Sequence, residues 1–367
     1  MATIYDIAFA NIYGIGPSIA KEIMQHYRST EEFFNESPSN LKTIFKNKTR
    51  TINEIINKTM FLRCEEELRF MEKYNIKPLF FKDEQYPQKL LNISDPPILL
   101  YYQGKGNLSH QRMVGVVGTR NATDYGKKIT EKIIGELKSF NVEIVSGLAY
   151  GIDSIAHKQS LKNNIPTFAV LAHGLDMIYP KENFDLALEM IENGGGILTE
   201  FMTKTTPERY NFPKRNRIIA GLCDCILVME AAKKSGSLVT ADLAMQYNRE
   251  VFSIPGRIGD NYSEGCNYLI ASQRANILHQ IGDISQIMNW DVVSNNHIEK
   301  ISTKPTNLTK DENILYDIIL NKGELHIDDL ILESKIDYAK ACASLLNMEL
   351  NGIILCLPKK TYKIIIH

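Results

Sequence analysis

The chain has 367 residues, of which 44% are hydrophobic and 23% charged, and its formal net charge is −1 at pH 7. A chain of this length and composition can bury a sizeable core, so we expect a globular protein of two or three domains. The near-neutral balance excludes a protein that coats nucleic acid through one global basic field, so any site for a polyanion must be local.

Targeting signals and metal motifs are not found in the sequence. The stretch MATIYDIAFANIYG lacks the basic region and long apolar core of a secretory signal, and no apolar run reaches the roughly 18 residues of a membrane span. We therefore expect a cytoplasmic protein without membrane contact. The cysteines form no Cys-x-x-Cys pair, so we interpret them as buried thiols and expect no metal, disulfide or cofactor. They are Cys64, Cys223, Cys225, Cys266, Cys342 and Cys356.

The first 112 residues contain short helices and then a connecting segment. In residues 1–60, Gly14, Gly16 and Pro17 form a turn before an amphipathic helix, which resembles a helix-hairpin-helix (SAM-like) domain. The turn's backbone N–H groups could hold a phosphate, or the glycines could serve only an ordinary αα-hairpin. Residues 61–112 connect onward. Pro96 and Pro97 forbid helix there, and the following ILLYY reads as a short strand.

Residues 113–290 alternate between buried apolar runs and amphipathic segments. The runs are residues 113–118, 142–147, 167–172, 196–201, 225–230 and 250–256. Buried strands joined by crossover helices predict an α/β fold with a Rossmann-like, doubly wound and mostly parallel sheet. Ligands of such sheets bind at the carboxyl ends of the strands.

Small residues recur at these strand ends. Gly118, Thr119 and Arg120 follow the first run, and Ser146 and Gly147 end the second. They would let backbone N–H groups approach anionic oxygens, which predicts a phosphate ligand, although glycine is also the ordinary residue of a tight turn. Neither GxGxxG nor GxxxxGK[ST] occurs, so the two common nucleotide fingerprints are absent.

A cluster of cations lies between residues 203 and 217. It contains Lys204, Arg209, Lys214, Arg215 and Arg217, with Glu208 as the only acid. A helix beginning near Lys214 would place these cations at the carboxyl edge beside Arg120. Tyr210 and Phe212 are interleaved with them, a mixture that single-stranded nucleic-acid sites use for stacking and phosphate contacts. The alternative is a solvated helix face.

The C-terminal part reads as a second domain. Residues 291–307 are polar and predict a flexible linker. Residues 308–367 then predict three helices and a strand-like tail, the order of a winged helix with its wing near Pro358. Because this segment has more acids than lysines, we favour a protein-contact or auxiliary role over sequence-specific DNA reading.

The motifs VGVVGTRNATDYG, IVSGLAYGID, FPKRNRIIAGL, SGSLVTADLA and EGCNYLI occur in this order and spacing in the DNA processing protein A (DprA, also called Smf) family. The chain resembles a full-length member. The resemblance implies a homodimer, without catalytic activity, that protects incoming single-stranded DNA and loads RecA recombinase onto it in natural transformation. From motifs and resemblance together, we expect the DNA to contact Gly118, Thr119, Arg120, Ser146, Gly147, Lys181, Phe212, Lys214, Arg215, Asn216, Arg217, Ser235, Gly236 and Ser237.

Two residues differ from the usual family pattern, and one motif also resembles a loop of a family of enzymes. Tyr150 stands where the family usually has a basic residue, and His173 where a small one is usual. SGSLVTADLA is also similar to the PGGxGTxxE loop of Rossmann-like nucleotide phosphoribohydrolases, whose glutamate stabilises an oxocarbenium-like transition state. Here Leu243 occupies that position and Asp242 is one residue away. An enzyme of that type is the alternative function.

Overall fold

The structure, a computed structural model, describes residues 2–46, 48–291, 308–323, 325–351, 353–357 and 360–364. It divides into two units, Met1–Val293 and Ser294–His367. Apart from Asp291, the predicted linker of residues 291–307 lies outside the described residues.

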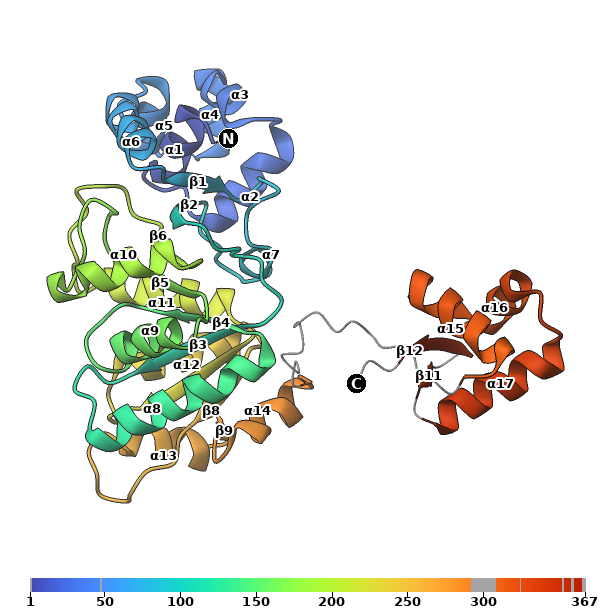
Figure 1. The fold of residues 1–367 in the computed structure, drawn as a ribbon. Helices are drawn as coiled ribbons and strands as arrows, with labels where there is room; N and C mark the ends of the chain where they lie inside the picture. Colours follow the sequence, from blue (N-terminus) through green and yellow to red (C-terminus); the bar gives the residue numbers. More distant parts are fainter. Residues whose placement is uncertain are drawn as a thin grey trace. The chain divides into compact units, whose positions relative to one another are not determined.

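Six helices form the N-terminal part of the first unit (Figure 1). They are α1 (Ile4–Asn11), α2 (Pro17–His26), α3 (Thr30–Phe34), α4 (Pro38–Ile44), α5 (Thr49–Ile56) and α6 (Phe61–Lys73). The turn between α1 and α2 contains Gly14 at φ +87°, a conformation that favours glycine. Next to it, the Tyr13 N–H donates to the Glu54 carboxylate at 3.0 Å. The same carboxylate pairs with Arg50 at 3.1 Å, so the phosphate site and the ordinary αα-hairpin both stay predictions for this turn.

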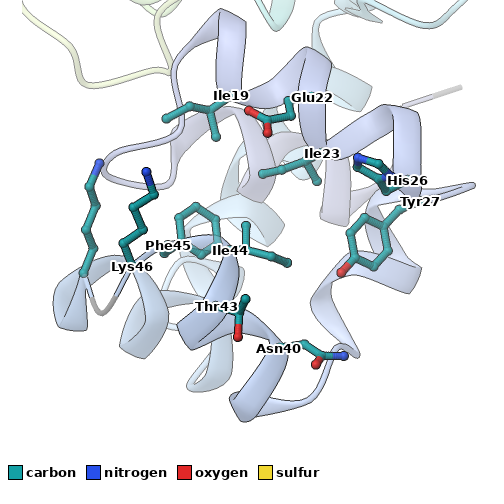
Figure 2. Close-up of a pocket in the computed structure, with 11 residues that line it drawn as sticks. Ile19, Glu22, Ile23, His26, Tyr27, Asn40, Thr43, Ile44, Phe45 and Lys46 are labelled. Carbon is teal, nitrogen blue, oxygen red and sulfur yellow. The ribbon is translucent and has the colours of Figure 1, made fainter.

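A pocket of about 660 Å³ lies among these helices, between α2 and α4 (Figure 2). Ile23 and Phe45 are buried against it, while His26 and Lys46 lie at its rim. None of its lining residues belongs to the sheet of the same unit, so this pocket is separate from the predicted phosphate site.

A nine-stranded sheet forms the centre of the first unit, in the order β1-β2-β6-β5-β4-β3-β7-β8-β9 (Figure 1). Its strands are β1 (Lys77–Phe80), β2 (Leu99–Gly104), β3 (Met113–Gly118), β4 (Glu143–Ser146), β5 (Thr167–Val170), β6 (Gly196–Thr199), β7 (Cys225–Glu230), β8 (Glu250–Ser253) and β9 (Asn276–Ile277). From β6 to β9 all neighbours are parallel, whereas β1 and β2 join antiparallel. The predicted α/β fold with a mostly parallel, doubly wound sheet is confirmed.

Helices cover both faces of this sheet. They are α7 (Gln88–Leu91), α8 (Asp124–Leu137), α9 (Ile152–Lys162), α10 (Phe184–Glu192), α11 (Asn211–Leu222), α12 (Gly236–Gln246), α13 (Glu264–Ala271) and α14 (Ile281–Met288), with the short 3-10 helices η1 (Lys138–Phe140) and η2 (Lys181–Asn183). Buried side chains of α8, α9 and α14 form one apolar core, and those of α11, α12 and α13 form part of another. Residues 61–112, expected to connect the domains and to form one short strand at ILLYY, contribute β1 and β2 to the sheet.

The first residue of β4, Glu143, is buried without a partner for its Oε2 among the described residues. Burial raises the pKa of this carboxyl from 4.5 to about 8, although Lys89 opposes the shift. As pH rises between these two values, the unfolded chain loses this proton while the folded chain keeps it, so stability falls. Glu143→Gln should therefore be more stable than the wild type at pH 8, on the order of a few kcal/mol.

Thermal unfolding of both proteins at about pH 5 and pH 8 would measure this difference, which should shrink at the lower pH. The exposed Glu131→Gln is the matched control. Equal pH dependence in wild type and Glu143→Gln would contradict the assignment of the high pKa to Glu143.

Among its described residues, the second unit contains three helices and a three-stranded sheet of order β10-β12-β11. Its elements are α15 (Lys310–Lys322), β10 (Leu325–His326), α16 (Ile327–Ser334), α17 (Tyr338–Leu350), β11 (Ile354–Leu357) and β12 (Thr361–Ile364). The order of elements is that of a winged helix. At the predicted wing, Pro358 and Lys359 lie outside the described residues.

The six cysteines differ in their burial. Four are buried as expected, whereas Cys342 and Cys356 of the second unit are only half-buried. In the described ranges, no helix has the length and apolar character needed to cross a bilayer.

Candidate nucleic-acid interface

The turn after β3 lies at the carboxyl edge of the sheet. The Thr119 N–H donates to the carbonyl of Glu230 at the end of β7, with a distance of 2.7 Å. This bond fixes the backbone just before Arg120, whose side chain is exposed and forms no ion pair with any described residue. Gly118 has no room for a side chain, because an added Cβ would lie 2.5 Å from Cγ1 of Ile152. The turn therefore holds one free guanidinium at a defined place.

Helix α11 brings the predicted cation cluster to this edge. It begins at Asn211, slightly before the expected Lys214, and its buried face is formed by Arg215, Ile218, Ile219 and Leu222, with helical spacing. Near its start, the Phe212 ring lies 5.0 Å from the guanidinium carbon of Arg120 and 5.8 Å from that of Arg215. Two cations thus hold one aromatic ring at the carboxyl edge.

Arg215 is buried and satisfied inside the protein. Its Nη1 donates to the carbonyls of Gly147 and Val170, both at 2.6 Å. Gly147 is required for this, because an added Cβ would lie 1.9 Å from Nη1. Burial lowers the pKa of Arg215 to about 10, against the opposing effect of the Asp153 carboxylate, so the group remains charged at neutral pH. Arg215 adds a fixed positive charge beneath the edge, and its guanidinium is already engaged with main-chain carbonyls.

The side chains next to Arg215 in the sequence differ in their partners and in their exposure to solvent. Arg217 pairs with Glu200 and also donates to the carbonyl of Asp95 at 2.5 Å, so it ties α11 to two other segments. The Asn216 Nδ2 donates to the carbonyl of Gly236 at 3.3 Å. Lys214 is exposed and forms no ion pair within the described ranges, so it is the cation of this trio that faces solvent.

Part of the predicted positive cluster is neutralised by distant acids. Lys204 pairs with Glu66 of α6 at 2.7 Å, a partner 138 residues away in the sequence. Arg217 likewise pairs with Glu200. Arg120, Lys214 and Lys181 at the start of η2 are exposed and form no ion pair with the described residues. The same holds for Arg209 of the predicted cluster.

The remaining predicted residues are placed as follows. Ser146 is fully buried and donates to the carbonyl of Val116 at 2.6 Å, so its hydroxyl serves the sheet. Ser235 and Ser237 share a hydrogen bond of 2.8 Å at the start of α12, next to the open Gly236. This Ser-Gly-Ser loop meets α11 through Asn216. The structure therefore joins it to the α11 side of the edge.

Beneath Phe212 lies a small cavity of about 10 Å³. It is lined by Arg120, Gly147, Ala149, Tyr150, Ala172, His173, Tyr179, Pro180, Phe212 and Arg215. This is space for about one water molecule, so no base fits inside it as the side chains stand. His173 is buried, with Nδ1 2.9 Å from the carbonyl of Gly174, and burial lowers its pKa, so the ring is neutral.

Exposed aromatic rings occur at this cavity, which Tyr150 and Tyr179 line, and at the N-cap of α11, which is Tyr210. Tyr150 is 45% exposed, Tyr179 44% and Tyr210 59%. Sequence reasoning identified Tyr210 and the departure at Tyr150 but did not select Tyr179. The signal for Tyr179 was its position in the YPKEN motif, directly before Pro180 and the predicted Lys181. The edge therefore offers stackable faces on its surface and free cations between them.

Comparisons with known proteins agree with this architecture. Residues 77–289 match the family model of DNA recombination-mediator protein A. Protein Smf of Synechocystis sp. is 41% identical over 272 residues, covering 72% of this chain and 68% of that protein. The X-ray structure of DNA processing protein A from Streptococcus pneumoniae superposes with a TM-score of 0.67 at 33% identity, over 79% of this chain and 99% of that one.

A second solved structure is that of DNA processing protein A from Helicobacter pylori, which describes the single-stranded DNA binding mode of that protein. It superposes with a TM-score of 0.54 at 31% identity, over 59% of this chain and 98% of that one.

Proposed function

Because the chain belongs to the DNA recombination-mediator protein A family, we propose that it binds single-stranded DNA at the carboxyl edge of its sheet. The observation that carries this proposal is the ring of Phe212, held at that edge by the guanidinium of Arg120 with the free Lys214 on the same helix. Aromatic faces bind unpaired bases of any sequence, and free cations bind the phosphates between them.

Each group has a distinct part in this proposal. Arg120, Lys181 and Lys214 contact phosphates, because they are exposed and carry no carboxylate partner within the described residues. Tyr210 and Phe212 offer faces to bases. Since the cavity beneath Phe212 holds only about 10 Å³, bases stack on the surface and are not inserted. Arg215 and Arg217 fix the geometry of the edge from within.

Membership of the family supports a proposal for the cellular role. We propose that the protein protects single-stranded DNA taken up in natural transformation and delivers it to RecA recombinase, acting as a homodimer in the cytoplasm. Relatives named DNA processing protein DprA in Streptococcus pneumoniae and Bacillus subtilis support a role in processing DNA. A deletion strain tested for uptake of chromosomal markers, and RecA filament assembly with the purified protein, would test these two steps.

Binding assays over a salt series test the central proposal. Labelled oligo-dT should bind more tightly than a duplex of equal length, because only unpaired bases expose their faces to Phe212 and Tyr210. On a short oligo-dT of about 4 nucleotides, which reaches only this site and its three exposed phosphate contacts, log K should fall with log salt at a slope of about −2. Equal affinity for single strand and duplex would contradict the proposed mode of binding.

The enzymatic alternative lacks its carboxylate. Leu243, at the position of the catalytic glutamate, packs against the hydrophobic core, and the neighbouring Asp242 pairs with Arg274. We therefore propose binding as the function, and release of free base from AMP by the purified protein would be the result that favours the enzyme.

A further inference from the structure

A second recess opens beside the proposed site, between the first turns of α8 and α9. It has a volume of about 730 Å³. Its lining residues are Arg120, Asn121, Ala122, Lys127, Tyr150, Gly151, Ser154, Ile155, Lys158, Glu182 and Asn183. We call it the α8–α9 recess. No sequence motif pointed to it.

The charge of the recess is predominantly positive. Arg120, Lys127 and Lys158 are exposed cations, against Glu182 as the single lining carboxylate. Glu182 already accepts a 2.6 Å hydrogen bond from the Tyr150 hydroxyl. Lys127 has only a surface partner, Asp124 at 3.2 Å, which is 90% exposed, and such a pair contributes little. Lys158 forms no ion pair within the described part of the chain. Two lysines are therefore available to an anion.

Internal hydrogen bonds hold the residues at the floor of the recess in place. The buried Asn183 donates to the carbonyl of Leu148 and to Oγ of Ser154, both at 2.8 Å. Gly151, at φ +74°, is the N-cap of α9, and an added Cβ would lie 2.3 Å from the carbonyl of Thr119. The Ile152 N–H donates to that carbonyl at 3.1 Å. Gly151 and Ser154 line the recess, so the positive end of the α9 dipole lies beside it and favours negative charge there.

The recess shares lining residues with the proposed site at Phe212, which indicates that both bind the same ligand. Arg120 and Tyr150 line both the small cavity beneath Phe212 and the α8–α9 recess. A DNA strand held at Arg120 can therefore continue into the recess, which the half-exposed Tyr150 ring and two lysines line. This is the same alternation of aromatic face and cation that the first site shows.

We propose that the α8–α9 recess binds the backbone phosphates of the nucleotides next to those held at Arg120 and Phe212, with Lys127 and Lys158 as phosphate contacts and Tyr150 as a stacking surface. The inference rests on the proposed single-stranded DNA binding and extends it to a longer path. Tyr150, which replaces a cation usual in the family, then contributes its ring while Lys127 and Lys158 supply charge.

The test compares Lys127→Gln/Lys158→Gln with wild type on short and long oligo-dT, of about 4 and about 16 nucleotides. On the long strand, the double variant should lose about tenfold in affinity, and its salt slope should weaken by about 1.4, which is about 0.7 for each lost contact. On the short strand, which occupies only the site at Phe212, both proteins should bind alike.

Lys132→Gln/Lys162→Gln removes two exposed lysines from the same helices outside the recess and is the matched control. An equal loss of long-strand affinity in this control, or an unchanged salt slope in the recess variant, would contradict DNA binding in the recess. Neither result would contradict the site at Phe212. Failure of the wild type to bind any oligo-dT would instead reject the proposed function itself.

Tyr150 is tested separately from the charges. Tyr150→Phe removes the hydrogen bond to Glu182 but keeps the ring, so long-strand affinity should be preserved. Tyr150→Leu removes the ring and should lower that affinity about fivefold or more, the lower range of one lost stacking contact. Equal affinity of the Phe and Leu variants would contradict stacking at this position.

Discussion

Replacing Arg120 with glutamate is expected to lower the affinity for oligo-dT by about 30- to 150-fold at low salt. The loss corresponds to about 2–3 kcal/mol, the range of a charge-assisted contact to phosphate, and repulsion by the new carboxylate adds to it. The guanidinium is exposed and holds one face of the Phe212 ring at 5.0 Å, so the variant also releases that ring. Fluorescence anisotropy with labelled oligo-dT would measure the effect.

The fold of this variant should be unchanged, because Arg120 makes no ion pair with the described residues and its backbone is held through Thr119. Arg28→Glu, a charge reversal at an exposed arginine among the N-terminal helices, serves as control for net charge. Similar losses in both variants would mean that the overall charge, and not the site at Phe212, determines binding.

Replacing Arg215 with methionine should destabilise the first unit by about 3 kcal/mol or more. The substitution leaves the carbonyls of Gly147 and Val170 without their donor, and it leaves the buried Asp153 carboxylate without the nearby positive charge that opposes its raised pKa. Denaturant unfolding followed by circular dichroism would show the shift. For the same reason, Arg215→Glu would not leave the fold intact, since it would bury a second carboxylate beside Asp153.

Lys214→Met is the matched control for this prediction, because it changes the adjacent residue on the same helix. Lys214 is exposed, so stability should change by less than about 0.5 kcal/mol while oligo-dT affinity falls. Equal stability of the Arg215 and Lys214 variants would show that the internal hydrogen bonds of Arg215 do not hold the edge together.

The sheet and the position of its carboxyl edge were predictable because they depend on local patterns. Near-continuous apolar runs as short as that of β3 indicate buried strands, and the helix-length segments between them make neighbouring strands parallel. Parallel strands end at one edge, which places Arg120 and the start of α11 together. The antiparallel attachment of β2 to β6 was not predictable, because it pairs Tyr101 with Thr199, nearly a hundred residues apart.

The partners of the cations were the part that sequence could not supply. Arg215 and Lys214 are adjacent cations in the sequence, yet the Arg215 side chain is buried and the Lys214 side chain is exposed. A clue existed in the spacing, since Arg215 precedes Ile218, Ile219 and Leu222 on one helical face and must share their burial. For Arg217 there was no such clue, because Glu200 and Asp95 reach it only through the tertiary fold.

The loop before α11 is hydrogen-bonded to helix α6 in the N-terminal part of the chain. Thr203 in this loop donates its N–H and hydroxyl to Glu67 of α6, and Arg63 of the same helix donates back to its carbonyl at 2.6 Å. These hydrogen bonds hold the loop that precedes Phe212 and Lys214 against α6. An evolutionary exchange or laboratory truncation of the N-terminal helices would therefore loosen the anchoring of the proposed DNA site as well as remove a separate-looking module.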